Sequence, residues 1–239
     1  MRHVLAIAAL CAAAGSASGA LFQWNSNGAG QDNSGGTISS INSTFNSSSK
    51  VFTWDVSYSN GATADTDGFW LVVSPGPNPK GHAHEFGIIY FDASSIGNTK
   101  VTVYRYNGQN ADNSFTNPGH LLASSLNPMD TQVLSHSASQ MGATRSFSVS
   151  INASVINSLF TPPTYPDWTG IEFGNKIGVW FHSVKGLNTA YDANGGLTQF
   201  SYGGQGWLDL SNQMTVPTPG ALMLAGAGVV LAARRRRAA

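Results

Sequence analysis

The stretch VFTWDVSY, residues 51–58, decides the fold class of this 239-residue chain. Every second position carries a large apolar side chain: Phe52, Trp54, Val56 and Tyr58. The positions between them are smaller and mostly polar. A period of two is that of a β-strand with one face on a hydrophobic core and the other toward solvent. The stretch therefore predicts a strand that is buried on one side.

Related patterns extend on both sides of this strand. Residues 145–151 repeat the alternation, with Phe147, Val149 and Ile151 facing one way and serines the other. Residues 69–73 form an uninterrupted apolar run, which is consistent with a central strand. The further strands expected are 21–24, 38–45, 85–91, 100–106, 121–123, 132–134, 171–173, 177–182, 198–202 and 207–210. One helix is expected, over residues 152–159, with Asn152 as its N-cap.

Together these elements indicate an all-β fold. About ten to twelve short strands with almost no helix are typical of a single antiparallel β-sandwich or jelly-roll-like domain. Charged residues make up 10% of the chain, well below the roughly 25% of ordinary soluble domains. Ser, Asn, Thr and Gly take their place, which is a composition of strands and turns. We expect this domain to occupy residues 21–215.

Residues 1–20 have the order of a secretory signal peptide. Arg2 and His3 precede an apolar stretch, which small residues follow. Cleavage is expected after Ala17 or Ala20. The protein is therefore predicted to be exported.

Residues 216–239 combine a turn, an apolar run over residues 221–233 and a basic end. The residues of the turn and of the basic end are Val216, Pro217, Thr218, Pro219, Gly220, Arg234, Arg235, Arg236 and Arg237. This order resembles the bacterial PEP-CTERM sorting signal, with Thr218 in place of the glutamate of the name motif. The resemblance implies processing by an exosortase-type membrane protease. It also implies a membrane-inserted precursor and delivery to the cell surface or the extracellular matrix.

An ordinary C-terminal membrane anchor is the alternative interpretation of this tail. As a helix, residues 221–233 would reach about 20 Å, whereas the hydrocarbon core of a bilayer is about 30 Å thick. The short reach favours a transient membrane association that ends with processing.

The net charge of the body, the part of the chain between the two end segments, argues against nucleic acid as a partner. Five of the 12 Lys and Arg residues lie in the two end segments and all 12 acidic residues lie between them, so the body has 7 basic and 12 acidic residues, a net charge of −5. An acidic body without clustered Lys and Arg does not suit nucleic acid. The single cysteine, Cys11, lies in the signal peptide. The mature domain is thus expected to hold neither a disulfide nor a cysteine nucleophile.

Calcium is the one cofactor that the sequence suggests. In the predicted acidic loop 65–68, Asp65 and Asp67 alternate before a glycine, as at the start of a calcium loop, and residues 192–196 are a looser instance. Neither continues to a glutamate at the twelfth position, and Asp and Gly are also ordinary turn residues. His82 and His84 resemble the start of the cupin metal motif, but its glutamate is missing. We therefore expect these histidines on an exposed turn.

No catalytic residue is predicted. The chain has no Gly-x-Ser-x-Gly and no His-Glu-x-x-His motif. A glycosidase requires two carboxylates beside the scissile bond, and the only two glutamates, Glu85 and Glu172, are far apart in sequence. A non-catalytic role is favoured.

Aromatic residues in loops are the better indication of binding, because exposed rings stack on sugar faces. Trp168 and Tyr191 lie in predicted loops, and Tyr191 stands beside Asp192 and Asn194, whose side chains can bond hydroxyl groups. These four residues form the candidate glycan site. Three other tryptophans lie in predicted strands and are expected in the core: Trp54, Trp70 and Trp180.

Three functions agree with these features. The first is a non-catalytic surface or matrix protein with a structural or adhesive role in extracellular polysaccharide. The second is a dedicated carbohydrate-binding module, and the third is a glycan-active hydrolase or lyase. An aromatic groove would favour the second, and a cleft with two facing carboxylates would favour the third.

Overall fold

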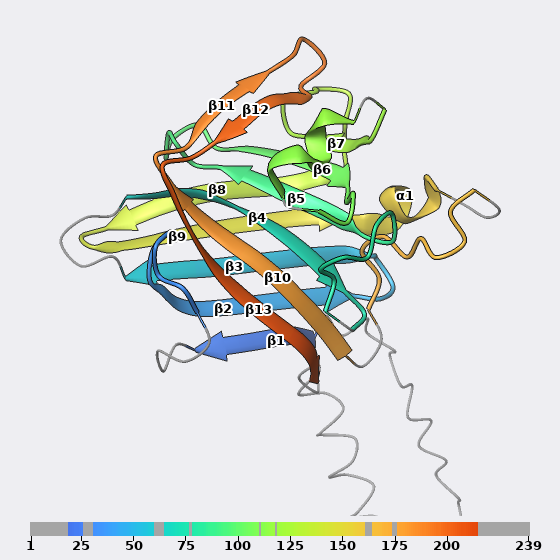
Figure 1. Cartoon of the computed structure of the whole chain (residues 1–239), viewed down its shortest axis with the longest axis horizontal. Coiled ribbons are helices and arrows are strands. Elements are labelled where there is room, and N and C mark those ends of the chain that lie inside the picture. The colour runs from blue at the N-terminus through green and yellow to red at the C-terminus, as the bar shows by residue number, and fades with distance from the viewer. Residues whose placement is uncertain are drawn as a thin grey trace, which may run out of the picture.

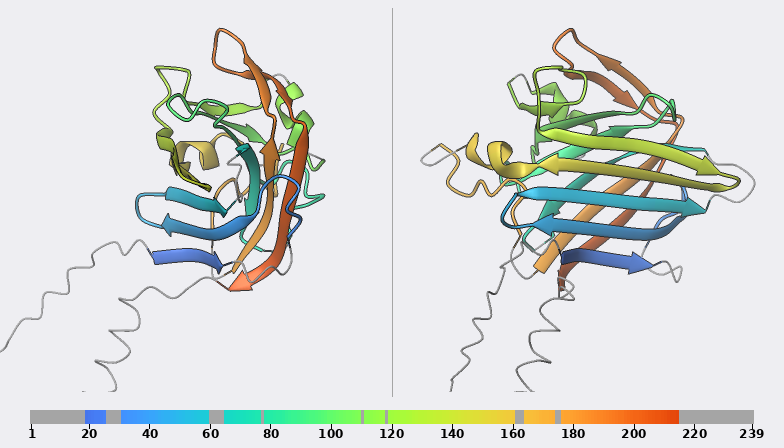
Figure 2. Two further views of the ribbon diagram at one scale, coloured as in Figure 1. Left: turned by 90° about the vertical axis from the view of Figure 1, so that its left-hand side faces the viewer. Right: turned by 180° about the vertical axis from the view of Figure 1, so that it is seen from behind.

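Two antiparallel sheets face each other and enclose the main core (Figures 1 and 2). The computed structural model describes residues 19–25, 31–59, 65–76, 78–109, 111–117, 119–160, 164–173 and 176–214. Seen from the side the sheets form separate layers, and seen from behind the five-stranded sheet lies in front (Figure 2). The predicted antiparallel β-sandwich is therefore confirmed.

The first sheet has five strands in the order β1-β2-β3-β9-β8. Their bounds are β1 Gly19–Asn25, β2 Ile38–Asn46, β3 Val51–Ser59, β8 Val133–Met141 and β9 Thr144–Asn152. Trp54 of β3 lies opposite Val149 of β9, and both side chains are buried. On the other face, the Ser148 hydroxyl donates to Oδ1 of Asp55 at 2.6 Å. The alternation expected for both strands is thus confirmed.

The second sheet has six strands in the order β13-β10-β4-β5-β6-β7. Their bounds are β4 Thr66–Ser74, β5 Gly87–Asp92, β6 Lys100–Arg105, β7 Leu121–Ser124, β10 Lys176–Lys185 and β13 Gly204–Met214. A separate hairpin consists of β11 (Asn188–Tyr191) and β12 (Leu197–Ser201). β4 is an inner strand of the sheet, as its apolar run predicted.

Aromatic rings from both sheets meet in the space between them. Phe69 stacks on Phe91 with 4.9 Å between ring centroids, and Phe147 of the first sheet lies 5.2 Å from Phe91. Rings at these separations add attraction beyond the burial of their area. The sandwich core thus depends on phenylalanines that are remote in sequence.

The second sheet is buried on its outer face as well. A second apolar cluster forms there, and its largest members are Trp70, Tyr90, Tyr104, Tyr106 and Trp180. The hairpin β11–β12 covers part of this cluster with Leu197 and Phe200. Residues 204–210 of the edge strand β13 are only partly covered. The hairpin therefore covers only part of the outer face, and aromatic side chains near β13 lie beside solvent-exposed surface.

The helical elements are short. α1 (Ala153–Ser158) was predicted, and its cap is confirmed because Oδ1 of Asn152 accepts the backbone N–H of Ser154 at 3.0 Å. The 3₁₀ helix η1 (Ala111–Thr116) was not predicted, because it lies in an Asn-rich segment that reads as a loop.

Two strand predictions and one loop prediction were wrong in detail. Residues 171–173 form no strand, and β8 extends to Met141 rather than ending near residue 134. β8 is an edge strand with most side chains exposed, so its polar sequence lacks the expected alternation. The acidic loop expected over residues 65–68 is also wrong from Thr66 onward, since β4 begins there.

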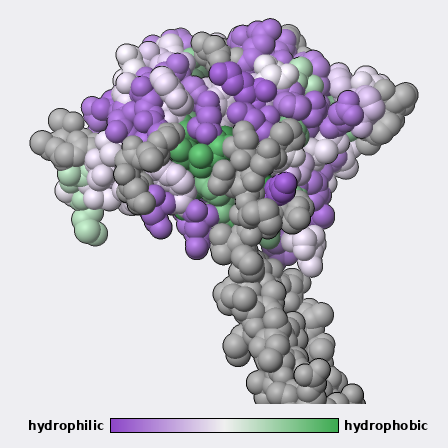
Figure 3. Space-filling model, turned by 60° about the horizontal axis from the view of Figure 1, so that its bottom comes forward, coloured by the Kyte–Doolittle hydropathy of each residue, from purple (hydrophilic) through white to green (hydrophobic). Residues whose placement is uncertain are grey.

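Both predicted targeting segments lie largely outside the described residues. The signal peptide overlaps the description only at residues 19–20, which begin β1, and the sorting tail lies wholly outside it. Within the described ranges, no helix has the length and apolar character needed to cross a bilayer. Figure 3 shows hydrophilic side chains around a hydrophobic patch near the centre of one face.

Candidate functional site

Three neighbouring strands align a row of rings on the outer face of the second sheet. His182 of β10 lies opposite Trp70 of β4 on one side and opposite Trp207 of β13 on the other. One step along the sheet, Trp180 lies opposite Asp209. Because residues two apart in a strand share a face, all five side chains point outward from the sandwich core.

Four of these side chains, all except Trp70, border a groove of about 360 Å³. The aromatic groove is lined by Lys80, Trp180, His182, Gln205, Trp207 and Asp209. Trp207 has 44% of its surface exposed, whereas Trp180 and His182 are buried. The groove therefore has an accessible ring at its side and a fixed aromatic wall beneath.

Ring packing holds the wall in place. The His182 ring stacks on Trp70 with 3.9 Å between centroids and 14° between planes. Trp180 meets Trp70 edge to face at 4.7 Å. Above Trp180, the ammonium nitrogen of Lys80 lies 5.3 Å from the ring centroid, within the range of a cation–π contact. The side chains are thus positioned without a ligand.

The groove contains polar atoms that the protein does not satisfy. Nδ1 of His182 donates to the side-chain oxygen of Gln205 at 3.2 Å, which leaves Nε2 as an acceptor. Nε2 of His182, Nε1 of Trp180 and Oδ1 of Asp209 are buried and have no hydrogen-bond partner. An unsatisfied buried polar atom costs about 1–3 kcal/mol. Donors and acceptors of this kind suit a ligand that is rich in hydroxyl groups.

Burial also changes the titration of two of these residues. It lowers the pKa of His182 to about 4, with Gln205 opposing the shift and Lys80 adding to it. The imidazole is therefore neutral at neutral pH. Burial raises the pKa of the Asp209 carboxyl, and the positive charge of Lys80 opposes that shift.

The structure places Trp168 against the core. Its side chain is half-buried and packs on the sandwich core, and its indole N–H donates to the backbone oxygen of Asn157 at 3.2 Å. Phe160 meets the ring edge to face at 5.1 Å. The part of Trp168 that would contact a glycan is thus reduced to its remaining exposed edge.

Tyr191, Asp192 and Asn194 lie together in the hairpin β11–β12. The Tyr191 hydroxyl donates to Oδ2 of Asp92 at 2.9 Å, and Oδ1 of Asp192 accepts the backbone N–H of Asn194 at 2.8 Å. Asp192 also borders a pocket of about 410 Å³ between β12 and residues 115–121. Trp168 belongs to the segment after α1, which Figure 1 shows away from the hairpin. The structure does not combine the four predicted residues into one site.

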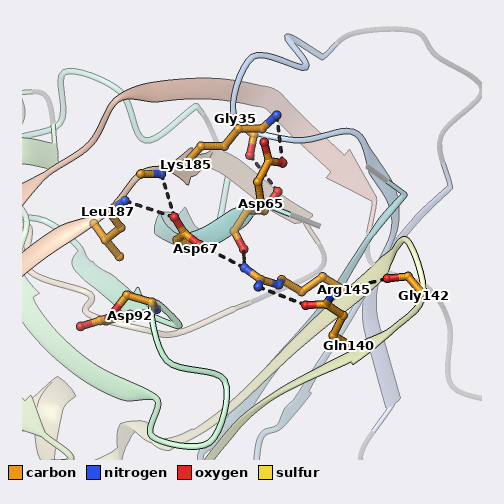
Figure 4. A network of polar contacts seen from close by, with 12 residues as sticks. Gly35, Asp65, Asp67, Asp92, Gln140, Gly142, Arg145, Lys185 and Leu187 are labelled. Carbon is orange, nitrogen blue, oxygen red and sulfur yellow. Dashed lines mark hydrogen bonds and ion pairs between the residues drawn. The ribbon is translucent and has the colours of Figure 1, made fainter. Parts of the chain in front are cut away.

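The predicted calcium ligands already have partners. Oδ1 of Asp67 accepts from Arg145 at 3.1 Å, and Oδ2 accepts the backbone N–H of Gly186 at 2.7 Å (Figure 4). Asp65 pairs with Lys185 at 3.1 Å. A calcium ion would have to compete with these two cations, and calcium binding here stays a prediction.

The two histidines of the predicted turn point to different partners. Nδ1 of His82 contacts the Glu85 carboxylate at 3.0 Å, whereas His84 packs 6.0 Å from Tyr165. Both are half-buried rather than exposed. Among the described residues, no group of three or more His, Cys, Asp or Glu side chains is arranged to hold a metal.

The carboxylates that could serve in hydrolysis are separated. Glu85 contacts His82 and Glu172 pairs with Lys50 at 2.9 Å. Asp209 is the one carboxylate among the described residues that line the aromatic groove. The described lining of this groove therefore does not include the pair of carboxylates that most glycosidases use.

The aromatic groove was not predicted, because Trp180 and Trp207 lie in predicted strands and their sequence does not show that the two strands pair. The available signal was the polar residues His182 and Asp209 within otherwise apolar strand segments. No protein-family model, curated protein or solved structure matches this chain. The groove therefore has to be interpreted from its own chemistry.

Proposed function

We propose that this chain is an exported, non-catalytic protein that binds extracellular polysaccharide through the aromatic groove. The observation that carries the proposal is the exposed ring of Trp207 beside unsatisfied polar atoms of His182, Trp180 and Asp209. Ligand sites commonly combine aromatic walls with a few placed polar groups. A sugar ring would stack on Trp207 and exchange hydrogen bonds with the groove.

The proposed location is the cell surface or the extracellular matrix. It rests on the signal-peptide pattern of residues 1–20 and on the resemblance of residues 216–239 to a PEP-CTERM sorting signal. An exosortase-type protease would be the processing partner, and membrane association would be transient. In this role the sandwich would act as an adhesive module in the matrix.

Binding is favoured over hydrolysis by the groove's composition. Asp209 is its one described carboxylate, and its other polar side chains are an amide, an imidazole and an ammonium group. This set can hold hydroxyl groups in place without supplying the acid and base of a glycosidase. A hydrolase or lyase remains the second candidate only if the polysaccharide is shortened on incubation.

Equilibrium binding of the full chain to the extracellular polysaccharide of the producing bacterium tests the proposal. Replacing Trp207 by Ala removes the accessible ring, and we expect the dissociation constant to rise at least tenfold, a loss of about 1.4 kcal/mol. Leu134→Ala is the matched control, because Leu134 of β8 is 49% exposed on the other sheet. Equal affinity of the wild type and the Trp207→Ala variant would contradict the proposal.

A further inference from the structure

A second, separate site is indicated by a buried arginine without a counter-charge. Arg105, the last residue of β6, is only 2% exposed, and its Nε and Nη1 atoms have no hydrogen-bond partner. Across the described part of the chain, five ion pairs form and none includes Arg105. A buried cation is costly unless it is paired and hydrogen-bonded.

The groups around Arg105 position the guanidinium but do not neutralise it. Its central carbon lies 4.0 Å from the ring centroid of Tyr165 and 4.6 Å from that of Phe160. Nη2 donates a hydrogen bond to Nε2 of His120 at 2.5 Å. The two aromatic faces attract a cation, yet they offer no acceptor in the plane of the guanidinium. The N–H groups at Nε and Nη1 are left without an acceptor.

Two histidines complete a cluster of potential cations. His84 and His120 lie 6.3 Å apart between ring centroids. Burial lowers the pKa of both, and the positive charge of Arg105 lowers each further. Nδ1 of His84 is buried and has no partner. The cluster thus gathers basic groups that repel one another and would be stabilised by negative charge.

The backbone at His84 is held in an unfavourable conformation. Its φ of +69° lies in the left-handed region, which is uncommon for a residue other than glycine. The backbone N–H of His84 donates to the backbone oxygen of Tyr106 at 2.9 Å. Gly108 packs against Ala83 so closely that a Cβ added to Gly108 would come within 2.7 Å of the Ala83 Cβ. Strain that the surrounding structure maintains is often found at binding sites.

His84 also connects the cluster to an open pocket. This pocket has a volume of about 320 Å³. Among the described residues, its lining besides His84 is uncharged and polar: Asn107, Gln109, Asn113, Thr116 and Asn117. Amide and hydroxyl groups of this kind can orient an oxygen-rich ligand. Of the three basic residues, His84 lines the pocket, and its ring lies 6.3 Å from that of His120, which contacts Arg105.

We propose that Arg105, His84 and His120 form a binding site for a small oxyanion, which enters through the pocket lined by His84. The oxyanion would accept hydrogen bonds from the guanidinium and from His84 and supply the missing negative charge. The site uses none of the groove residues, so it does not rest on the proposed binding of polysaccharide. A free inorganic anion and the carboxylate of an acidic sugar share the required chemistry.

Calorimetric titration of the full chain with sulfate, with glucuronate and with glucose tests this site. We expect saturable one-site binding of sulfate, glucuronate or both, and none of glucose. Binding of sulfate alone would assign an inorganic oxyanion or sulfate ester, and binding of glucuronate alone would assign a carboxylate. Absence of saturable binding for both anions would overturn the proposal.

Variants locate the binding in the cluster. His84→Gln and Arg105→Gln are each expected to weaken anion binding at least tenfold, whereas Lys176→Gln removes an exposed charge elsewhere and should leave it unchanged. Because Arg105→Gln alters a buried group, His84→Gln on the half-buried turn keeps the test decisive if the former fails to fold. As the anion saturates the site, the ring NMR signals of His84 and His120 should shift along the same binding curve. Equal losses in His84→Gln and Lys176→Gln would refute a specific site.

Discussion

Folding lowers the pKa of His182, so in mildly acidic solution the folded protein lacks a proton that the unfolded chain binds on this residue. Its ring is buried against Trp70, and its pKa falls to about 4, compared with about 6.5 in an unfolded chain. Between these values the unfolded state carries the extra proton, so the free energy of unfolding falls as the pH falls. The same neutral imidazole provides the acceptor nitrogen of the groove.

This linkage predicts acid sensitivity. From about pH 6.5 down to about pH 4, His182 should cost the folded protein on the order of 3 kcal/mol, and His182→Gln should remove that part of the pH dependence. Denaturant unfolding at several pH values measures it. His84, His120 and His136, whose pKa values burial also lowers, contribute in the same direction in both proteins. Parallel curves for wild type and variant would rule out this role of His182.

At the scale of elements, one buried carboxylate helps to attach the hairpin β11–β12 to the second sheet. Asp92 at the end of β5 is 2% exposed. Its Oδ2 accepts the hydroxyls of Thr189 and Tyr191 at 2.6 and 2.9 Å, and its Oδ1 accepts the Ser94 hydroxyl at 2.6 Å. Burial acts to raise the pKa of Asp92, but these hydrogen bonds outweigh burial and the pKa lies below its ordinary value.

Replacing Asp92 by Asn should destabilise the protein by about 2 kcal/mol at pH 7, because the bonds to a charged acceptor are weakened. The contribution is fully present above the unfolded pKa of about 3.9 and is lost as the pH falls through the lower folded pKa. The difference between variant and wild type should therefore shrink in strong acid. Urea unfolding measures both conditions, with the exposed Asp167→Asn as control. A constant difference at all pH values would argue against a charged Asp92 in the fold.

At the scale of the whole molecule, the proposed export predicts a processed chain. Protein recovered from the cell surface or matrix should lack residues 1–17 or 1–20 and the apolar and basic part of residues 216–239. Mass spectrometry of the intact protein determines both ends. Replacing Arg234, Arg235, Arg236 and Arg237 by Gln should prevent C-terminal processing and leave the tail in the recovered chain. Recovery of an unprocessed wild-type chain would instead favour an ordinary anchor.

Local alternation explains which parts of the fold were predictable. β3 and β9 each bury one face, so a period of two is visible in their residues before any partner is known. β8 pairs on one side only and most of its side chains are exposed. Its largely polar sequence therefore shows no alternation, and only the beginning of the strand was predicted. β11 was missed for a related reason, because its four residues, NTAY, include no run of large apolar side chains.

The candidate sites were less predictable, since each depends on strands that meet only in the folded sheet. Trp70 lies more than a hundred residues before His182 in sequence, yet the order β13-β10-β4 stacks their rings. Trp168 stood out by its place in a loop, and only the structure shows its packing against Phe160 and its hydrogen bond to the backbone of Asn157.

The sequence by itself determined that this protein is a β-sandwich and that its acidic residues all lie in the body, with four of its arginines gathered near the C-terminal end, because alternation and composition are local properties. It also carried the resemblance on which the proposed export depends. Only the tertiary structure decided which aromatic residues are buried, and that Trp207 remains accessible beside His182 and Asp209. The physical reason is that burial and unsatisfied hydrogen bonds depend on neighbours, which strand order and sheet packing assign.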